Sequence, residues 1–178
     1  YGVWWQRGEI STGSGSLTID GATGSDPSVE TNPNYGVGVG VEGSSSFRSV
    51  YSGTGGLTII GTTTTTSSDH QGVSVRFADF DAGASTVTIQ SNRRIQLLQD
   101  VSVKSRFEVT SDQNVFVNGA QSWTGSSGGR SAVLTSTAGS INIGAAITSS
   151  SGLGFVCNSG TFTTSSSGTI NSGGNVDV

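Results

Sequence analysis

Methionine is absent from the 178 residues, and cysteine and histidine occur once each, as Cys157 and His70. A lone cysteine has no partner for an intrachain disulfide, and a lone histidine offers no ligand set for a transition metal. These absences exclude a disulfide scaffold and leave no recognisable catalytic constellation, so we expect neither an enzyme nor a bound cofactor. The missing methionine predicts that the chain is a segment of a longer protein.

Charge is also scarce, with 12 acidic and 8 basic residues, a net charge of −4 and 11% charged residues. This balance argues against a nucleic-acid partner, because such proteins need a dense basic surface. No stretch approaches the roughly 18 uninterrupted apolar residues of a membrane-spanning helix. We therefore expect no nucleic-acid binding and no membrane span in this segment.

Glycine is abundant, at 28 residues, and short segments alternate apolar with polar residues between runs of serine and threonine. A spacing of two between apolar side chains predicts β-strands, and glycine between the segments predicts turns. The predicted strand cores are Leu17–Ile19, Leu57–Ile59, Val73–Val75, Val87–Ile89, Val101–Val103, Val115–Val117, Ile141–Ile143 and Val176–Val178.

The N-terminal half contains an internal repeat. Gly15–Gly21 reads G-S-L-T-I-D-G and Gly55–Gly61 reads G-G-L-T-I-I-G, and a second motif, Y-G-V or Q-G-V, begins at Tyr1, Tyr35 and Gln71. The spacing predicts two-strand units that begin near residues 1, 35 and 71, with an insertion around 42–46 in the middle unit and less regular coils over 92–178.

Units of this kind bury their apolar faces only when they stack on one another. We therefore expect an all-β fold, a right-handed parallel β-helix formed by residues 1–178 as one domain, with about 20 residues per coil and eight or nine coils. An antiparallel β-sandwich is the alternative, since it also uses many short strands.

The two repeat motifs and the stretch G-S-I-N-I-G-A-A-I at 139–147 resemble the repeats of filamentous-haemagglutinin-type and autotransporter-type bacterial surface proteins. The resemblance implies a β-helical shaft, exported to the bacterial cell surface or the extracellular space, with a role in adhesion or in a fibre. It also implies glycan or cell-surface ligands and self-association, end to end or laterally. A β-helical polysaccharide lyase or hydrolase and a glycan-binding module are the rival functions.

Three tryptophans are candidate ligand-binding residues. Trp4 and Trp5 are adjacent, so strand alternation turns one inward and leaves the other exposed as a ring on which a sugar can stack. Trp123 lies in the glycine-rich stretch Q-S-W-T-G-S-S-G-G-R with Arg130, and we expect it to be exposed.

Two carboxylates are candidate metal ligands or catalytic acids. In the stretch F-A-D-F-D, alternation places Asp79 and Asp81 on one face, with Arg76 near them and Phe80 turned inward. Paired carboxylates of this kind bind calcium or act as acid and base in carbohydrate-active enzymes. The competing interpretation is a solvated outer face.

Overall fold

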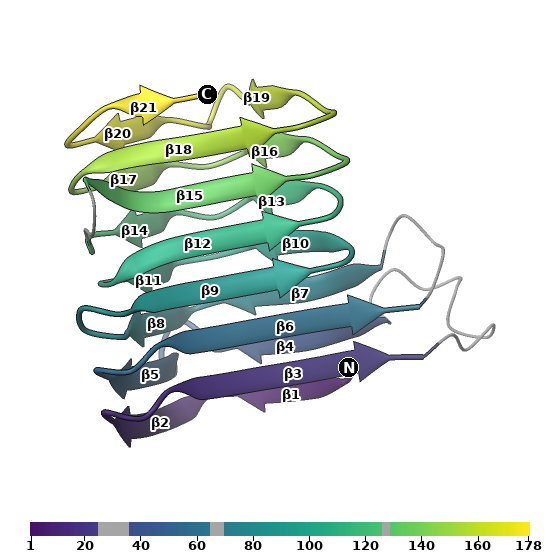
Figure 1. Ribbon diagram of the computed structural model, residues 1–178, viewed down its shortest axis with the longest axis vertical. Coiled ribbons are helices and arrows are strands. Elements are labelled where there is room, and N and C mark those ends of the chain that lie inside the picture. The colour runs from purple at the N-terminus through teal and green to yellow at the C-terminus, as the bar shows by residue number, and fades with distance from the viewer. Residues whose placement is uncertain (25–35, 65–69, 126–128) are drawn as a thin grey trace.

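The computed structural model describes residues 1–24, 36–64, 70–125 and 129–178, and within these ranges every regular element is a β-strand (Figure 1). The strands form three sheets of seven strands each, and every pairing is parallel. The prediction of a parallel β-helix is therefore confirmed, and the alternative of an antiparallel sandwich is wrong.

Each coil contributes one strand to each sheet. Sheet A consists of β1 (Val3–Gln6), β4 (Val37–Glu42), β7 (Gln71–Arg76), β10 (Arg94–Leu97), β13 (Val115–Val117), β16 (Ile141–Ile143) and β19 (Phe162–Thr164). Sheet B consists of β2 (Gly8–Gly13), β5 (Ser49–Gly53), β8 (Ala78–Asp81), β11 (Val101–Val103), β14 (Gln121–Trp123), β17 (Ile147–Ser149) and β20 (Ile170–Ser172). Sheet C consists of β3 (Leu17–Thr23), β6 (Leu57–Thr63), β9 (Thr86–Ser91), β12 (Arg106–Ser111), β15 (Arg130–Ser136), β18 (Gly152–Cys157) and β21 (Val176–Asp177).

The chain winds upward in Figure 1 as a right-handed coil, with sheet C in front and sheet A behind. It completes seven coils rather than the expected eight or nine, which at the usual strand spacing separates the first coil from the last by roughly 30 Å. The expectation was too high because the first coils are long: Val3 pairs with Val39, 36 positions away, whereas Ile95 pairs with Val115, 20 positions away.

The sequence repeat corresponds to one complete coil of three strands, not to a two-strand unit. In the first two coils, the strand that the two-strand unit lacks belongs to sheet B. These strands, G-E-I-S-T-G in β2 and S-V-Y-S-G in β5, are short and weakly apolar. The insertion expected near 42–46 is the six-residue connection between β4 and β5, where the equivalent connections in the first and third coils are the single residues Arg7 and Phe77.

The second repeat motif is aligned two residues later than the sequence suggested. Val37, not Tyr35, occupies the position equivalent to Gln71, and Gly38 is therefore equivalent to Gly72; Tyr35 itself lies outside the described residues. A Cβ added to Gly38 would lie 2.6 Å from the backbone nitrogen of Thr62, and one added to Gly2 would lie 2.5 Å from that of Ala22. The motif glycine thus permits sheet A to approach sheet C within a coil.

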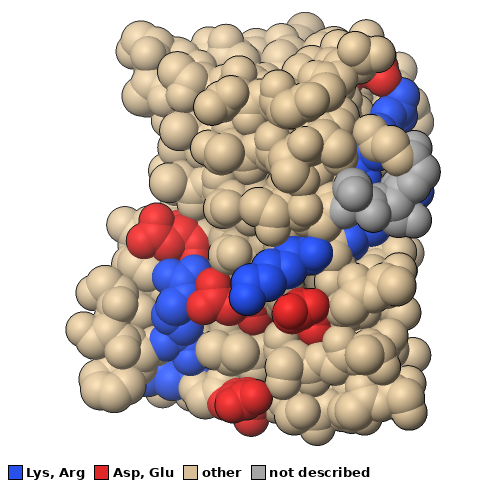
Figure 2. Space-filling view, turned by 90° about the vertical axis from the view of Figure 1, so that its left-hand side faces the viewer, with Lys and Arg blue, Asp and Glu red and all other residues tan. Residues whose placement is uncertain are grey.

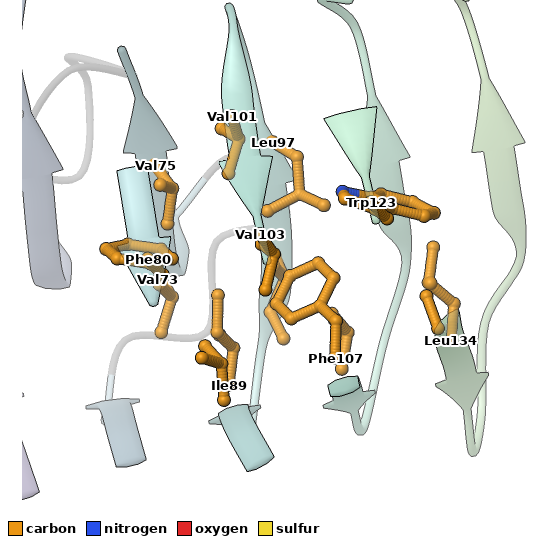
Figure 3. Close-up of a cluster of buried hydrophobic side chains, with 14 of the residues drawn as sticks. Val73, Val75, Phe80, Ile89, Leu97, Val101, Val103, Phe107, Trp123 and Leu134 are labelled. Atoms are coloured by element: carbon orange, nitrogen blue, oxygen red, sulfur yellow. The ribbon is translucent and has the colours of Figure 1, made fainter. Parts of the chain in front are cut away.

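The interior is a continuous apolar column lined by alternate residues of the three sheets (Figure 3). Aromatic side chains pack on one another in this column: the ring centroids of Trp5 and Phe80 lie 6.2 Å apart, and those of Phe107 and Trp123 lie 5.4 Å apart with planes inclined by 60°. The inward side chains from neighbouring coils are fully buried against one another, so each coil supplies part of the core of the next.

Buried serines close the corner where sheet C turns toward sheet A. Ser91, Ser111 and Ser136 stack in register at the ends of β9, β12 and β15. The Oγ of Ser111 accepts a hydrogen bond from the nitrogen of Gln113 at 3.1 Å and donates one to the carbonyl of Arg93 in the preceding coil. Ser136 likewise donates a hydrogen bond to the preceding coil, from its Oγ to the carbonyl of Gln113 at 2.6 Å. Ser111 and Ser136 therefore each satisfy a turn and join it to the preceding coil, and Ser91 accepts the equivalent local bond from the nitrogen of Arg93.

We expect Trp123→Ala to lower the free energy of unfolding by about 3–5 kcal/mol, because it empties a fully buried site in the core. Chemical denaturation measures this loss. Trp123→Phe should cost less, since it keeps most of the ring and removes an indole Nε1 that is buried and has no hydrogen-bond partner among the described residues. Trp4→Ala is the control, with an expected cost below about 1 kcal/mol at a half-exposed position. Equal losses for Trp4→Ala and Trp123→Ala would contradict the packing.

Candidate functional site

Of the two adjacent tryptophans, Trp4 is the accessible one. Alternation along β1 turns Trp5 into the core at 9% exposure and leaves Trp4 at 50%. Trp4 therefore lies on the outer face of sheet A, while Trp5 belongs to the packing described above.

Trp123 is not exposed, and the expectation that it lies in an open loop is wrong. It is the last residue of β14, points inward and is fully buried between Phe107 and Leu134, as Figure 3 shows. The glycines that follow it in sequence suggested a loop, but the loop begins only after the strand has placed the indole in the core. Trp123 cannot contact a ligand in this fold.

Tyr1 forms a stacked pair with Trp4, with ring centroids 5.3 Å apart and planes inclined by only 8°. Both rings rest on Gly40 of β4: a Cβ there would lie 2.5 Å from Cε1 of Tyr1 and 3.3 Å from Cδ1 of Trp4. The absence of a side chain at Gly40 therefore makes room for the pair on the face of sheet A. Tyr1 remains half-exposed at 51%.

Glu42 and Arg76 hold the Tyr1 hydroxyl in place. The hydroxyl donates a hydrogen bond of 2.8 Å to Oε1 of Glu42, and Nη2 of Arg76 donates one of 3.1 Å to Oε2 of the same carboxylate. Glu42 is at the end of β4 and pairs in register with Arg76 of β7, so neighbouring coils create this contact. Burial, the hydrogen bond to Glu42 and its negative charge together raise the pKa of Tyr1 to about 12.

A pocket of about 250 Å³ lies beside the Tyr1 ring on sheet A. Its polar lining comes from Tyr1, Glu42, Gln71, Ser74 and Arg76, and we refer to it as the Tyr1 pocket. Two polar atoms of its lining, Oε1 of Gln71 and Nε of Arg76, are buried and have no hydrogen-bond partner among the described residues. Such atoms cost free energy unless a ligand or water satisfies them.

Asp79 and Asp81 share the outer face of β8, and Phe80 is buried between them, as the alternation predicts. Their basic neighbour is Arg48 rather than Arg76, which pairs with Glu42 instead. Nε of Arg48 donates to Oδ2 of Asp79 from the connection between β4 and β5, and Oδ1 of Asp81 accepts the backbone N–H of Gly83 at 3.0 Å. No pattern in the sequence indicated this pairing, because 31 positions separate Arg48 from Asp79.

This charged surface occupies the lower coils of the side on which sheet B lies, and the upper part of that side is largely uncharged (Figure 2). Asp79, Asp81 and Lys104 line a pocket of about 140 Å³ there. Over the ranges 1–24, 36–64, 70–125 and 129–178, no group of three or more His, Cys, Asp or Glu could hold a metal ion. A metal at Asp79 and Asp81 stays a prediction, and it would have to compete with Arg48 for Asp79.

The isolated histidine and cysteine do not form a site together. His70 is buried against Gly36, and Cys157, at the end of β18, is only partly buried against the core. His70 is therefore a packing residue rather than an exposed loop residue.

Comparison of the chain with protein-family models, with curated proteins and with solved structures gives no significant match in any of the three. Within the described parts of the chain, no helix is long and apolar enough to cross a membrane. Function is therefore inferred from the fold and from the two surfaces described above.

We expect the substitution Glu42→Gln to lower the pKa of Tyr1 from about 12 toward, but not to, its ordinary value near 10, because burial of the phenol remains when the negative charge is removed. Titration of tyrosinate absorbance measures the shift, with Tyr1→Phe subtracted to isolate this residue. Since the pKa is higher in the folded state, the contribution of Tyr1 to stability is complete below about pH 10 and is lost as the pH rises toward 12. An unchanged pKa in Glu42→Gln would contradict the contact.

Proposed function

We propose that this chain is a structural and adhesive segment of an extracellular bacterial surface protein or fibre, a stiff β-helical shaft that carries a binding surface on its side. The observation that supports the shaft is the stack of seven coils, each of which adds one strand to each of the three sheets. Parallel ladders and a shared core run through the whole described chain, so a force along the axis is distributed over every coil interface.

The outer surface supports an extracellular, load-bearing role. Ser, Thr, Asn and Gln are common at outward strand positions, and on the side of sheet B the charged residues lie mainly over the lower coils (Figure 2). Rods with little net charge approach one another with weak repulsion, which favours lateral association in a fibre. The resemblance of the repeats to those of bacterial surface adhesins agrees with this proposal.

Adhesion requires an exposed contact surface, and the Tyr1–Trp4 pair supplies one. The two rings are the largest half-exposed aromatic surface on sheet A, and polar side chains lie beside them. Aromatic faces bordered by hydrogen-bonding groups are suited to glycans, so a glycan on a cell surface is the partner that we propose.

Force spectroscopy tests the shaft. With the chain pulled between two reporter domains, we expect sequential release of coils of 20 to 36 residues, each adding roughly 70–130 Å of contour length. Val109→Asp, which introduces a charge into the core of β12, should lower the force at which the adjoining coils release.

Thr110→Asp is the matched control, because its side chain points outward from the same strand and should leave the trace unchanged. A single low-force release of the whole chain would contradict a load-bearing role.

A β-helical carbohydrate-active enzyme is the second candidate, and the pocket shared by Asp79, Asp81 and Lys104 favours it. If the chain is an enzyme, it should release reducing ends from a polysaccharide, and the double substitution Asp79→Asn and Asp81→Asn should abolish the release. Under our first proposal we expect no release from any polysaccharide of a broad panel.

A further inference from the structure

The Tyr1 pocket has an aromatic wall that is already in position. Trp4 covers one face of the Tyr1 ring, and Tyr1 also lines the pocket over the next coil, where Ser74 lies in register with Gly40. The bond from the Tyr1 hydroxyl to Glu42 fixes the far end of the ring. A ligand therefore meets a ring that is held at three points, by Trp4, Gly40 and Glu42, and loses little entropy in ordering it.

The pocket contains one hydrogen-bond acceptor and one donor that have no partner among the described residues. Oε1 of Gln71 accepts, and Nε of Arg76 donates. Ser74, between them on β7, has a hydroxyl that can do both. A ligand with neighbouring hydroxyl groups, which donate and accept at once, satisfies this set, whereas a purely apolar ligand leaves it unpaired.

The charges in the pocket cancel. The positive charge of Arg76 is paired with Glu42, and the remaining oxygen of Glu42 accepts from Tyr1. An anionic ligand would meet the Glu42 carboxylate, and a cationic ligand would meet the Arg76 guanidinium. The balance favours an uncharged ligand.

The volume of about 250 Å³ is just below the range of about 300–1,000 Å³ that is usual for drug-sized ligands, and it suits one sugar ring. A pyranose has a face of C–H bonds for the Tyr1 ring and a rim of hydroxyls for the polar groups. The half-exposed Trp4 and Tyr1 leave the pocket open to solvent, so the rest of a chain of sugars can extend outward.

We propose that the Tyr1 pocket binds one neutral hexopyranose unit of a glycan, with the sugar stacked on Tyr1 and its hydroxyls bonded to Gln71, Ser74 and Arg76. Trp4 is a positioning residue that supports the Tyr1 ring. This inference names the ligand class of the adhesive surface and rests on the proposed function in that respect.

Calorimetric titration with defined oligosaccharides tests the proposal. The probes are cellotetraose, maltotetraose, mannotetraose and galactotetraose, with tetragalacturonate as the acidic comparison. We expect at least one neutral probe to bind at millimolar concentrations or below and to bind more tightly than tetragalacturonate.

Four variants locate the site. Tyr1→Ala removes the stacking face and Arg76→Met removes the donor, and each should weaken binding about tenfold or more, whereas Tyr1→Phe keeps the ring and should restore most of the affinity lost in Tyr1→Ala. Gly40→Ala should also weaken binding, although it replaces no residue that lines the pocket, because the added Cβ displaces the Tyr1 ring.

Phe47→Ala is the matched control, since it removes another exposed aromatic ring, at 64% exposure, that does not line the pocket. Unchanged far-UV circular dichroism in each variant confirms that the coil is intact. Failure of all four neutral probes, preference for tetragalacturonate, or full binding by Tyr1→Ala would each overturn the proposal. None of these substitutions alters the core, so the force measurements on the shaft succeed or fail independently.

Discussion

The in-register pairing of parallel coils is the constraint on which the rest of the structure depends. A single coil is a thin triangle of three short strands and cannot enclose a core by itself. Pairing Val39 with Val3 on one side and with Val73 on the other satisfies the backbone and at the same time aligns the inward side chains. The side chain at an inward position such as Val39 must therefore pack against side chains of the coils on both sides. In sheet B, for example, Val103 lies between Phe80 and Trp123 along the axis, whereas Tyr51 is the direct register partner of Phe80 on its other side.

Alternation in the sequence predicts strands of sheets A and C where every second residue is apolar, as in Leu57–Ile59 and Val115–Val117, but β12, β15 and β18 of sheet C were not predicted. The strands of sheet B were missed where polar and glycine residues dilute the pattern, as in β2 and β5. The repeat was placed two residues early at Tyr35 for a different reason. A shift of two keeps every side chain on the same face, so the pattern alone does not distinguish the two alignments. Strand pairing distinguishes them, because Val37 lies in register with Gln71 and Val39 lies in register with Val73.

The residues of the candidate site were predicted only in part from the sequence. Alternation predicts that one of Trp4 and Trp5 is exposed and the other buried, without saying which. The exposure of Trp123 was predicted wrongly, because the glycines after it suggested a loop although it lies at the end of a strand. Glu42 and Arg76 were not predicted as a pair, since 34 positions separate them and the coil length that aligns them was unknown. Gly40 was an available signal. A glycine on the outer face of a strand often marks a position where another group lies close against the sheet, as the rings of Tyr1 and Trp4 do here.

The inward and outward residues of the same strands are subject to different constraints: the inward ones pack in the core, and the outward ones form the surface. The inward residues of β4 and β7 are fixed by the coils above and below, whereas the outward residues Gly40, Glu42, Ser74 and Arg76 touch only side chains on the surface and the ligand we propose. A substitution in the outer row therefore changes binding with little effect on stability, and one in the inner row does the reverse. A shaft built in this way can carry a recognition site anywhere along its length, because the stacking that makes it stiff also brings residues more than 30 positions apart to the same few ångströms of surface.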